Sequence, residues 1–342
     1  MSAARLIWVL QGSRTGDNAQ ARELASRLSG EVVLKPLDFN ARRHLPNWLA
    51  GASLASLTPE VLHLISPPWP ALVIATGKRT VPVARWIGLA SDGAAKLIHL
   101  GRPRAALEHF DLVVSTPQYG LPAHPRLIEM TLPFAVARPV ANAEIERWSA
   151  EWRDLPRPLI AVVVGASKFP LTLSDEALAE LGKGTSGLAA RTGGSLLVLF
   201  SPRSEADTAG KIAPNLTGPH RLYPWLPGGS NPYQAALALA DRFIVTNDSA
   251  SMLSEALSTG KPVNIFELPA SPWRVTWNAR RGLGAWLARS GLVQPPRDIG
   301  VISRQLLEGG HVAALGGEDR PLTPYRRNDD EVLKRIAALT NP

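Results

Sequence analysis

Four turns in the second half of the chain carry residue types that bind phosphate groups. Each turn follows a short run typical of a strand, and together they supply a lysine, an arginine and several hydroxyls. Because the carboxyl ends of parallel strands meet at one edge of a sheet, these turns would lie together beside a helix N-terminus, which attracts anions. Each turn alone is equally typical of an ordinary strand-to-helix connection, but the four together favour a phosphate or diphosphate site. They span residues 165–168, 201–204, 228–233 and 247–249.

The best-defined of these turns lies in the segment 241–263. Residues 243–246 are typical of a buried strand, and residues 251–257 place their apolar side chains on one face of a helix. The Asn, Asp and Ser at 247–249 between them are all suitable N-cap types. Glu255 lies two turns into this helix, where it could accept hydrogen bonds from ribose hydroxyls. Its spacing is equally compatible with an ordinary solvated helix glutamate.

Two polar turns in the first half, residues 12–18 and 76–80, could also approach a ligand. Neither matches the dinucleotide-binding fingerprint G-x-G-x-x-G or the phosphate-binding loop GxxxxGK[ST], so both are also compatible with simple tight turns. Asp17 is the carboxylate of the first turn. It is therefore our candidate for a general base.

Other chemistries lack the residues that they need. The chain has no cysteine, and its seven histidines are scattered, so the sequence predicts no metal site. It contains no D-x-D motif for a metal-held diphosphate and no G-x-S-x-G nucleophile elbow. The ten tryptophans are mainly expected to pack in the cores, although Trp273, Trp277 and Trp286 could line an apolar acceptor groove.

The composition favours a basic protein with an anionic partner. The 342 residues carry a formal net charge of +8, which suits nucleotide-sugar phosphates, anionic lipid or nucleic acid. Nucleic acid is not expected as the primary partner, because no run of five Lys/Arg and no RNA- or DNA-reading motif occurs. The apolar runs are too short for a signal peptide or a membrane span. We therefore expect a cytoplasmic protein, or one bound to the cytoplasmic surface of a membrane.

Strands and helices alternate along both halves, which predicts an α/β fold with two Rossmann-like domains facing across a cleft. Within the first half, Trp48 and Leu49 are expected to pack in the interior. The last helix, at about 329–339, is expected to return to the first domain. The predicted divisions are a first domain at 1–140, a helix and Pro-containing linker at 141–157, a second domain at 158–310, and a tail with the closing helix at 311–342.

The segments 246–256 and 259–263 resemble the block D-S-x-S-M-x-x-E-A…G-K-P-V of one protein family. That family includes the plant elongated-mitochondria fission factor and many bacterial proteins described as glycosyltransferases. Weaker matches occur in family order over about residues 5–270. They are Gly16-Asp17-Asn18-Ala19-Gln20, Gly77-Lys78-Arg79-Thr80, Gly165-Ala166-Ser167-Lys168, Ser201-Pro202-Arg203 and Asn231-Pro232-Tyr233.

The resemblance implies a GT-B-type fold whose second domain binds a nucleotide-sugar donor without a metal or a tightly bound cofactor. By analogy, Ser249 and Ser251 would hold the diphosphate, Glu255 the ribose, and Lys168 and Arg203 would neutralise the leaving group. Bacterial relatives are linked to lipopolysaccharide or lipooligosaccharide core assembly, which implies a glycolipid acceptor at the inner membrane. The remaining donor-binding candidates are Gly165, Ser167, Ser201, Asn231, Tyr233, Asn247, Asp248 and Met252. The first-domain cleft candidates are Gly12, Gly16, Asn18, Gln20, Gly77, Lys78, Arg79 and Thr80.

One segment departs from the family pattern. Where the family usually reads Pro-x-His-Asp, this chain has Pro117-Gln118-Tyr119-Gly120. If the histidine or aspartate serves catalysis in relatives, this chain lacks it, and the plant factor acts as an adaptor in organelle division. The alternatives to a transferase are therefore a non-catalytic adaptor with a protein partner, or a nucleotide-sugar epimerase, which needs no acceptor.

Overall fold

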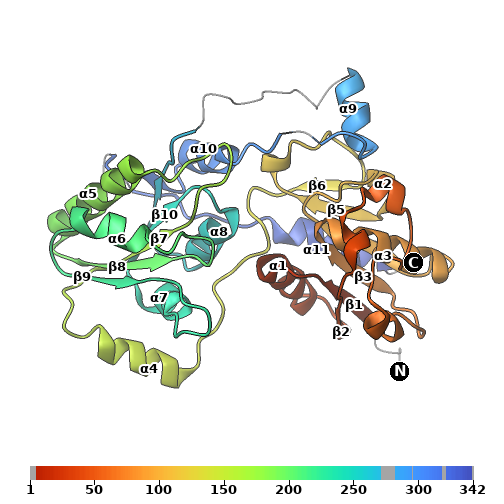
Figure 1. Ribbon diagram of the computed structural model, residues 1–342, viewed down its shortest axis with the longest axis horizontal. Coiled ribbons are helices and arrows are strands. Elements are labelled where there is room, and N and C mark those ends of the chain that lie inside the picture. Colours follow the sequence, from red (N-terminus) through yellow and green to blue (C-terminus); the bar gives the residue numbers. More distant parts are fainter. Residues whose placement is uncertain (1–4, 271–281, 295, 318–320, 341–342) are drawn as a thin grey trace. The chain divides into compact units, whose positions relative to one another are not determined.

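The computed structural model describes residues 5–270, 282–294, 296–317 and 321–340, which fall into two compact units (Figure 1). Unit 1 takes its described residues from Met1–Phe134, Thr276–Asp298 and Arg327–Pro342. Unit 2 takes its described residues from Ala135–Val275 and Ile299–Arg326. Each unit is built on its own sheet of parallel strands, which confirms the predicted α/β class with two Rossmann-like domains.

Unit 1 contains a six-stranded parallel sheet in the order β2-β1-β3-β4-β5-β6. Most of these strands are short apolar runs buried on both faces, as parallel strands covered by helices must be. The strand order reverses between β1 and β3, so the turns after these two strands border the crevice where such sheets usually bind ligands. The strands are Leu6–Gln11 (β1), Glu31–Pro36 (β2), Leu72–Thr76 (β3), Lys96–Leu100 (β4), Leu112–Ser115 (β5) and Leu127–Glu129 (β6).

The closing helix of the chain belongs to unit 1, as predicted. Val332 and Ile336 of this helix are buried in one core cluster with Leu24 of α1. Arg27 at the end of α1 also forms an ion pair with Asp329. The helices of unit 1 are Thr15–Ser26 (α1), Asn47–Ala50 (α2), Gly77–Ala90 (α3), Gly282–Arg289 (α9) and Asp329–Thr340 (α11). Its 3₁₀ turns are Ala41–His44, Pro59–Leu64, Leu107–His109 and Pro117–Tyr119.

The predicted packing of Trp48 and Leu49 is wrong. Their side chains are 61% and 58% exposed, respectively. The helix α2 has four residues, so it turns only one side chain fully inward, and that residue is Asn47. The Asn47 amide nitrogen Nδ2 donates to the carbonyl oxygen of Pro103 at 2.8 Å. A buried hydrogen bond, rather than an apolar contact, therefore holds this segment against the turn after β4.

Unit 2 contains a second six-stranded sheet in the order β12-β11-β10-β7-β8-β9, with all of its strand pairs parallel. The order reverses between β7 and β10, which places the turns 165–168 and 247–249 side by side. The strand β9 ends at Tyr223, because the next residue, Pro224, has no N–H to donate to the ladder. The strands are Leu159–Val164 (β7), Ser195–Phe200 (β8), His220–Tyr223 (β9), Arg242–Thr246 (β10), Val263–Phe266 (β11) and Ala313–Ala314 (β12).

The helix α4 lies in unit 2, where its two tryptophans pack against β9. The rings of Trp148 and Trp152 stack with centroids 5.4 Å apart, and Trp152 Nε1 donates to the hydroxyl of Tyr223 at 2.6 Å. These rings therefore pack in unit 2, as expected for most of the tryptophans. The helices of unit 2 are Asn142–Glu151 (α4), Asp175–Thr192 (α5), Thr208–Ile212 (α6), Tyr233–Leu239 (α7), Ala250–Ser258 (α8) and Gly300–Glu308 (α10), with a 3₁₀ turn at Ala213–Asn215.

A buried histidine in β4 makes a pH prediction for unit 1. His99 is fully buried, and burial lowers the pKa of its imidazole from 6.5 to about 4. The ring is therefore neutral at neutral pH, and its Nε2 lies 3.4 Å from the carbonyl oxygen of Gly77, which can only accept a hydrogen bond. The unfolded chain binds a proton at higher pH than the folded chain. The free energy of unfolding should thus fall by up to about 3 kcal/mol as the pH falls from about 6.5 to 4.

Urea unfolding of the natural chain and of His99→Gln across this pH range tests that expectation. The variant should show a smaller decrease in stability toward acid pH, whatever its stability at neutral pH. An identical pH dependence in both proteins would contradict the role of this histidine.

Candidate functional site

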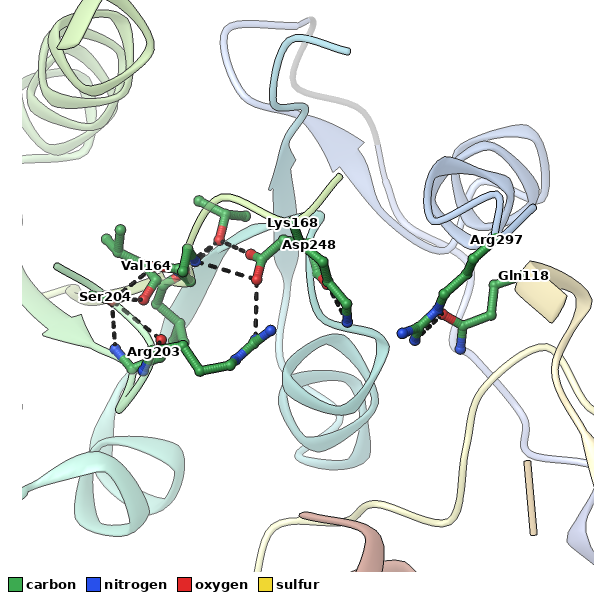
Figure 2. A network of polar contacts seen from close by, with 12 residues as sticks. Gln118, Val164, Lys168, Arg203, Ser204, Asp248 and Arg297 are labelled. Atoms are coloured by element: carbon green, nitrogen blue, oxygen red, sulfur yellow. Dashed lines mark hydrogen bonds and ion pairs between the residues drawn. The ribbon is translucent and has the colours of Figure 1, made fainter. Parts of the chain in front are cut away.

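The buried carboxylate of Asp248 joins three turns at the carboxyl edge of the unit 2 sheet (Figure 2). Its Oδ1 accepts a hydrogen bond from the hydroxyl of Thr246 at 2.8 Å. Its Oδ2 accepts from the amide of Ala166 at 3.3 Å and from Arg203 Nη2 at 3.1 Å. A buried carboxylate needs such donors, since without them the loss of hydration would cost several kcal/mol. The acid is thereby fixed within unit 2.

Gly165 is a glycine because the Asp248 carboxylate occupies the space of a side chain. A Cβ atom on this residue would lie 1.9 Å from Asp248 Oδ1. The Gly165 amide donates to the hydroxyl of Thr246 at 2.8 Å, and the Gly165 carbonyl accepts from Ser204 at 2.7 Å. The glycine thus links the turn after β7 to the turns after β10 and β8.

The turn after β8 presents Arg203 beside this centre. The hydroxyl oxygen of Ser201 accepts from the amide of Arg203 at 3.2 Å, which shapes the turn locally. The Arg203 side chain is 45% exposed although Asp248, its partner, is not exposed. One edge of the guanidinium therefore binds the buried acid while the group still reaches solvent. Such a cation is positioned in advance for an anionic ligand.

Two of the candidate donor ligands are used inside the protein. Asn247 is buried, and its Oδ1 accepts from the amide of Leu268 at 3.0 Å, so it secures the segment after β11. Asp248 is buried as described above. Of the three possible N-cap residues, the structure selects Ser249, whose backbone is extended and whose side chain makes no capping hydrogen bond. Asn247 and Asp248 are therefore positioning residues.

The start of helix α8 gathers groups that favour negative charge. The first N–H groups of a helix have no acceptor within the helix, and the helix dipole is positive at this end. Lys168 Nζ lies 3.5 Å from the carbonyl oxygen of Asp248, directly before the helix. Ser249 and Ser251 are half-buried at the same end. This combination of a cation, hydroxyls and a helix N-terminus is suited to a phosphate group.

Glu255, farther along α8, is not an ordinary solvated glutamate. Its carboxylate accepts a short hydrogen bond from the hydroxyl of Tyr233 at the start of α7. Burial raises the pKa of the Glu255 carboxyl, against the opposing effects of the Tyr233 hydrogen bond and of Arg138. Burial, together with the charge of Glu255, also raises the pKa of the tyrosine. Asn231 Oδ1 accepts from the Tyr233 amide at 2.9 Å and so fixes the turn that presents the tyrosine.

The other two candidates of unit 2 lie at the margins of this arrangement. Ser167 Oγ accepts from the amide of Leu173 at 2.9 Å, so it holds the loop after β7. Met252 is buried on α8 and packs in the interior. Both residues shape the surroundings of the α8 N-terminus.

In unit 1, the two predicted turns contact each other after β1 and β3. Arg79 Nη1 donates to the hydroxyl of Ser13 at 2.9 Å. Gly77 has a left-handed backbone, with φ of 68°, and a Cβ atom there would lie 3.3 Å from Asp17 Oδ2. The carboxylate of Asp17 therefore lies beside the N-terminus of α3, which Lys78 also borders. The structure thus brings together the candidate base and the second polar turn.

The remaining candidates of unit 1 shape these turns or lie on the first helix. Asn18 closes the first turn, because its Oδ1 accepts from the Gly12 amide at 2.9 Å and its Nδ2 donates to the Gly12 carbonyl at 2.8 Å. Thr80 Oγ1 donates to the carbonyl of Thr76 at 2.8 Å. Gly16 and Gln20 are residues of α1.

The sequence did not reveal a group of arginines at the same edge of unit 1. Two guanidinium groups contact the ring of Tyr119, with Arg102 Cζ at 5.3 Å and Arg297 Cζ at 4.9 Å from its centroid. Gln118 Oε1 accepts from Arg297 Nε at 2.7 Å (Figure 2). The run Gly-Arg-Pro-Arg after β4 was a local signal for Arg102 and Arg104. Arg297 is separated from Gln118 by 179 residues, so no local pattern could place it there.

Metal binding and membrane spanning have no structural support in the described part of the chain. Among those residues, no group of three His, Asp or Glu side chains could hold a metal ion. In the same residues, no helix combines the length and apolarity needed to cross a bilayer. Of the tryptophans considered for an acceptor groove, Trp286 is 59% exposed on α9, whereas Trp273 and Trp277 lie outside the described residues.

Two parallel-sheet units of six strands each, with polar turns at their carboxyl edges, define a GT-B-type fold. A sequence profile described as "Mitochondrial fission ELM1" matches residues 15–296, and the chain belongs to that family. The family resemblance noted in the sequence is thereby confirmed.

Individual relatives agree with this assignment. The chain is 26% identical over 230 residues to the mitochondrial fission protein ELM1 of Arabidopsis thaliana, a match covering 60% of this chain and about half (53%) of that protein. It is 24% identical over 297 residues to the uncharacterized protein RP120 of Rickettsia prowazekii, covering 77% and 83% of the two chains. A solved structure named "putative UDP-N-acetylglucosamine 2-epimerase" from Listeria monocytogenes has a TM-score of 0.52 at 12% identity, covering 99% and 89%. The last likeness shows the fold alone.

The packing around Asp248 predicts a large effect of one methyl group. Gly165→Ala places a Cβ atom against the buried carboxylate and should destabilise the protein by about 2 kcal/mol or more. Gly210→Ala, in the short helix α6, meets no atom within 4 Å and should change stability by less than about 1 kcal/mol. Urea unfolding of both variants makes the comparison. Equal stability of the two variants would contradict the central role of the Asp248 carboxylate.

Proposed function

We propose that this chain is a metal-independent glycosyltransferase that moves a sugar from a nucleotide-sugar to a cell-envelope glycolipid. The observation that carries the proposal concerns helix α8. Glu255 on this helix is paired with Tyr233 of α7, and Lys168 borders the N-terminus of α8. Glu255 lies five residues into α8, about 7.5 Å along the helix axis. One nucleoside diphosphate can span that separation, with its ribose at the glutamate and its phosphates at the helix start.

The chemistry of each end supports this orientation. A carboxylate accepts hydrogen bonds only, so Glu255 suits the paired hydroxyl donors of a ribose. Ser249, Ser251 and the N–H groups of α8 suit phosphate oxygens, and Lys168 and Arg203 supply positive charge. The donor would therefore bind to unit 2 through residues on two helices and three strand-end turns.

The proposed reaction needs a base for the acceptor and stabilisation of the leaving group. The acceptor hydroxyl oxygen attacks the anomeric carbon of the sugar, and the bond from that carbon to the diphosphate oxygen breaks. The electron pair leaves with the nucleoside diphosphate, whose charge Lys168 and Arg203 would stabilise. The hydroxyl proton passes to a base, for which we propose Asp17.

A non-catalytic binding protein is the second candidate, and one observation favours it. Tyr119 and Gly120 stand where the family pattern has His and Asp, and the Tyr119 ring contacts the guanidinium groups of Arg102 and Arg297. Such a protein would bind a nucleotide-sugar without consuming it. An epimerase would convert the nucleotide-sugar to an isomer without an acceptor. Analysis of the products therefore distinguishes a transferase, an epimerase and a non-catalytic binding protein.

Calorimetric titration with UDP-, GDP-, ADP- and CMP-sugars tests the proposal. We expect one of these classes to bind, and Glu255→Gln to weaken its affinity about tenfold through loss of a charged hydrogen-bond acceptor. Glu180→Gln, on the exposed side of α5, is the matched control and should leave the affinity unchanged. The proposal fails if none of the four classes binds, or if the two variants have equal affinity.

The stability of Glu255→Gln distinguishes a ligand-binding role from a structural one. Because burial raises the pKa of Glu255, the ionised carboxylate destabilises the folded chain at neutral pH. That cost is absent below the ordinary carboxyl pKa and appears as the pH rises. Glutamine is neutral, so the variant should be at least as stable as the natural chain at pH 7 while binding nucleotide more weakly. Weaker binding together with a clear loss of stability would indicate a structural role instead.

A further inference from the structure

A second set of cations lies at the carboxyl edge of the unit 1 sheet. Lys78 follows β3, Arg102 and Arg104 follow β4, and Arg297 lies against the turn that follows β5. We call these four residues the basic cluster. In a parallel sheet such positions share one edge, which is where ligands of open α/β sheets bind. This placement makes the basic cluster a candidate anion site.

Two arginines of the cluster, Arg102 and Arg297, are held by neighbouring side chains. The ring of Tyr119 carries Arg102 and Arg297, with their Cζ atoms at 5.3 and 4.9 Å from its centroid. The buried amide of Gln118 fixes Arg297 further. Guanidinium groups oriented in this way lose little freedom when they bind an oxyanion, and their planar shape matches phosphate oxygens. Tyr119, which stands where the family pattern has a histidine, and its neighbour Gln118 thus contact these cations.

The turn that carries Arg102 and Arg104 is rigid and strained. The Pro103 carbonyl accepts a hydrogen bond from the buried Asn47. Ala105 packs closely against Gly291, since a Cβ atom added to Gly291 would lie 2.5 Å from the Ala105 Cα. Arg104 adopts a left-handed backbone with φ of 55°, and its side chain is exposed. A non-glycine residue rarely adopts this conformation, and such strain is concentrated at functional sites. A glycine would adopt this backbone conformation with less strain, so Arg104 lowers the stability of the folded chain relative to a glycine at this position.

The cations of this edge also repel one another. Burial, with contributions from Arg104 and Arg297, lowers the pKa of Arg102 to about 10. Burial, with contributions from Arg104, Arg79 and Arg14, lowers the pKa of Lys78. With a pKa of about 10 the Arg102 side chain remains charged at neutral pH, and a bound anion would relieve the repulsion among these cations. Asp17, beside Gly77, is an acid at the same edge and would oppose an anionic ligand.

We propose that the basic cluster binds a phosphate monoester or diphosphate group, which in the glycosyl-transfer scheme belongs to the acceptor. Phosphate binding by unit 1 stands independently of that scheme, whereas its assignment to the acceptor rests on the proposed function. The acceptor would then be a phosphorylated molecule rather than a neutral glycan.

Exposed apolar side chains beside the cluster favour a lipid as the source of the phosphate. Trp48 and Leu49 directly follow Asn47, which contacts Pro103, and Leu292 directly follows Gly291, which contacts Ala105. All three side chains are at least half exposed. Apolar side chains next to cations are typical of surfaces that contact anionic membranes.

Titration with inorganic pyrophosphate at low salt tests phosphate binding. Arg104→Gly removes one charge and suits the left-handed backbone, so the variant should fold with equal or greater stability. We expect it to weaken pyrophosphate binding to unit 1 about tenfold, while Arg22→Ala, an exposed arginine on α1, leaves it unchanged. Asp17→Asn should strengthen binding. Equal affinity of the Arg104 and Arg22 variants would overturn the proposal.

Lys168→Ala separates this site from the donor site, which a pyrophosphate could also occupy. Loss of pyrophosphate binding in Arg104→Gly but not in Lys168→Ala supports the unit 1 site even if no nucleotide-sugar binds. Loss only in Lys168→Ala overturns it and leaves the donor proposal standing.

Vesicles identify the source of the phosphate group. Sedimentation with phosphatidylcholine vesicles that contain phosphatidic acid, and not with pure phosphatidylcholine, supports a lipid source if Arg104→Gly abolishes it. Pyrophosphate binding without vesicle binding supports a soluble phosphorylated ligand. Failure of both probes in the natural chain overturns the proposal.

Discussion

The buried carboxylate of Asp248 is the interaction on which the polar edge of unit 2 depends. A charge without water is stable only when donors replace its hydration, and here a hydroxyl, a backbone amide and a guanidinium do so. Those donors come from different turns, so satisfying one acid fixes the ends of three strands together. Gly165 leaves the space that this arrangement needs. The start of α8 is consequently placed by the same bonds that neutralise the acid.

The two units hold cations at the carboxyl edges of their sheets in different ways. Both have six parallel strands and a reversal of strand order, and both gather polar turns at the carboxyl edge. In unit 2 the buried acid Asp248 balances the charge of Arg203, and Lys168 supplies a further positive charge beside the start of α8. In unit 1 the aromatic ring of Tyr119 and the amide of Gln118 position arginines near one another. Cations therefore have distinct surroundings in the two units.

Most of the strands and the clustering of the unit 2 turns could be predicted from the sequence, because apolar runs and the geometry of parallel sheets are local or general properties. The packing of Trp48 was predicted wrongly, since a helix of four residues has no reliable apolar face. The positioning role of Asp248 could not be predicted, because the sequence does not tell whether an acid at a strand end points outward or inward. The contact of Arg297 with Gln118 depends on tertiary folding across 179 residues.

A crystal structure of the protein grown with UDP, GDP or ADP tests most directly the central claim that the Asp248-centred turns form a nucleotide-binding site. We expect a diphosphate at the N-terminus of α8, near Lys168 and Arg203, with ribose hydroxyls within hydrogen-bond distance of Glu255. A nucleotide bound elsewhere on the chain, or with its ribose away from Glu255, would contradict it.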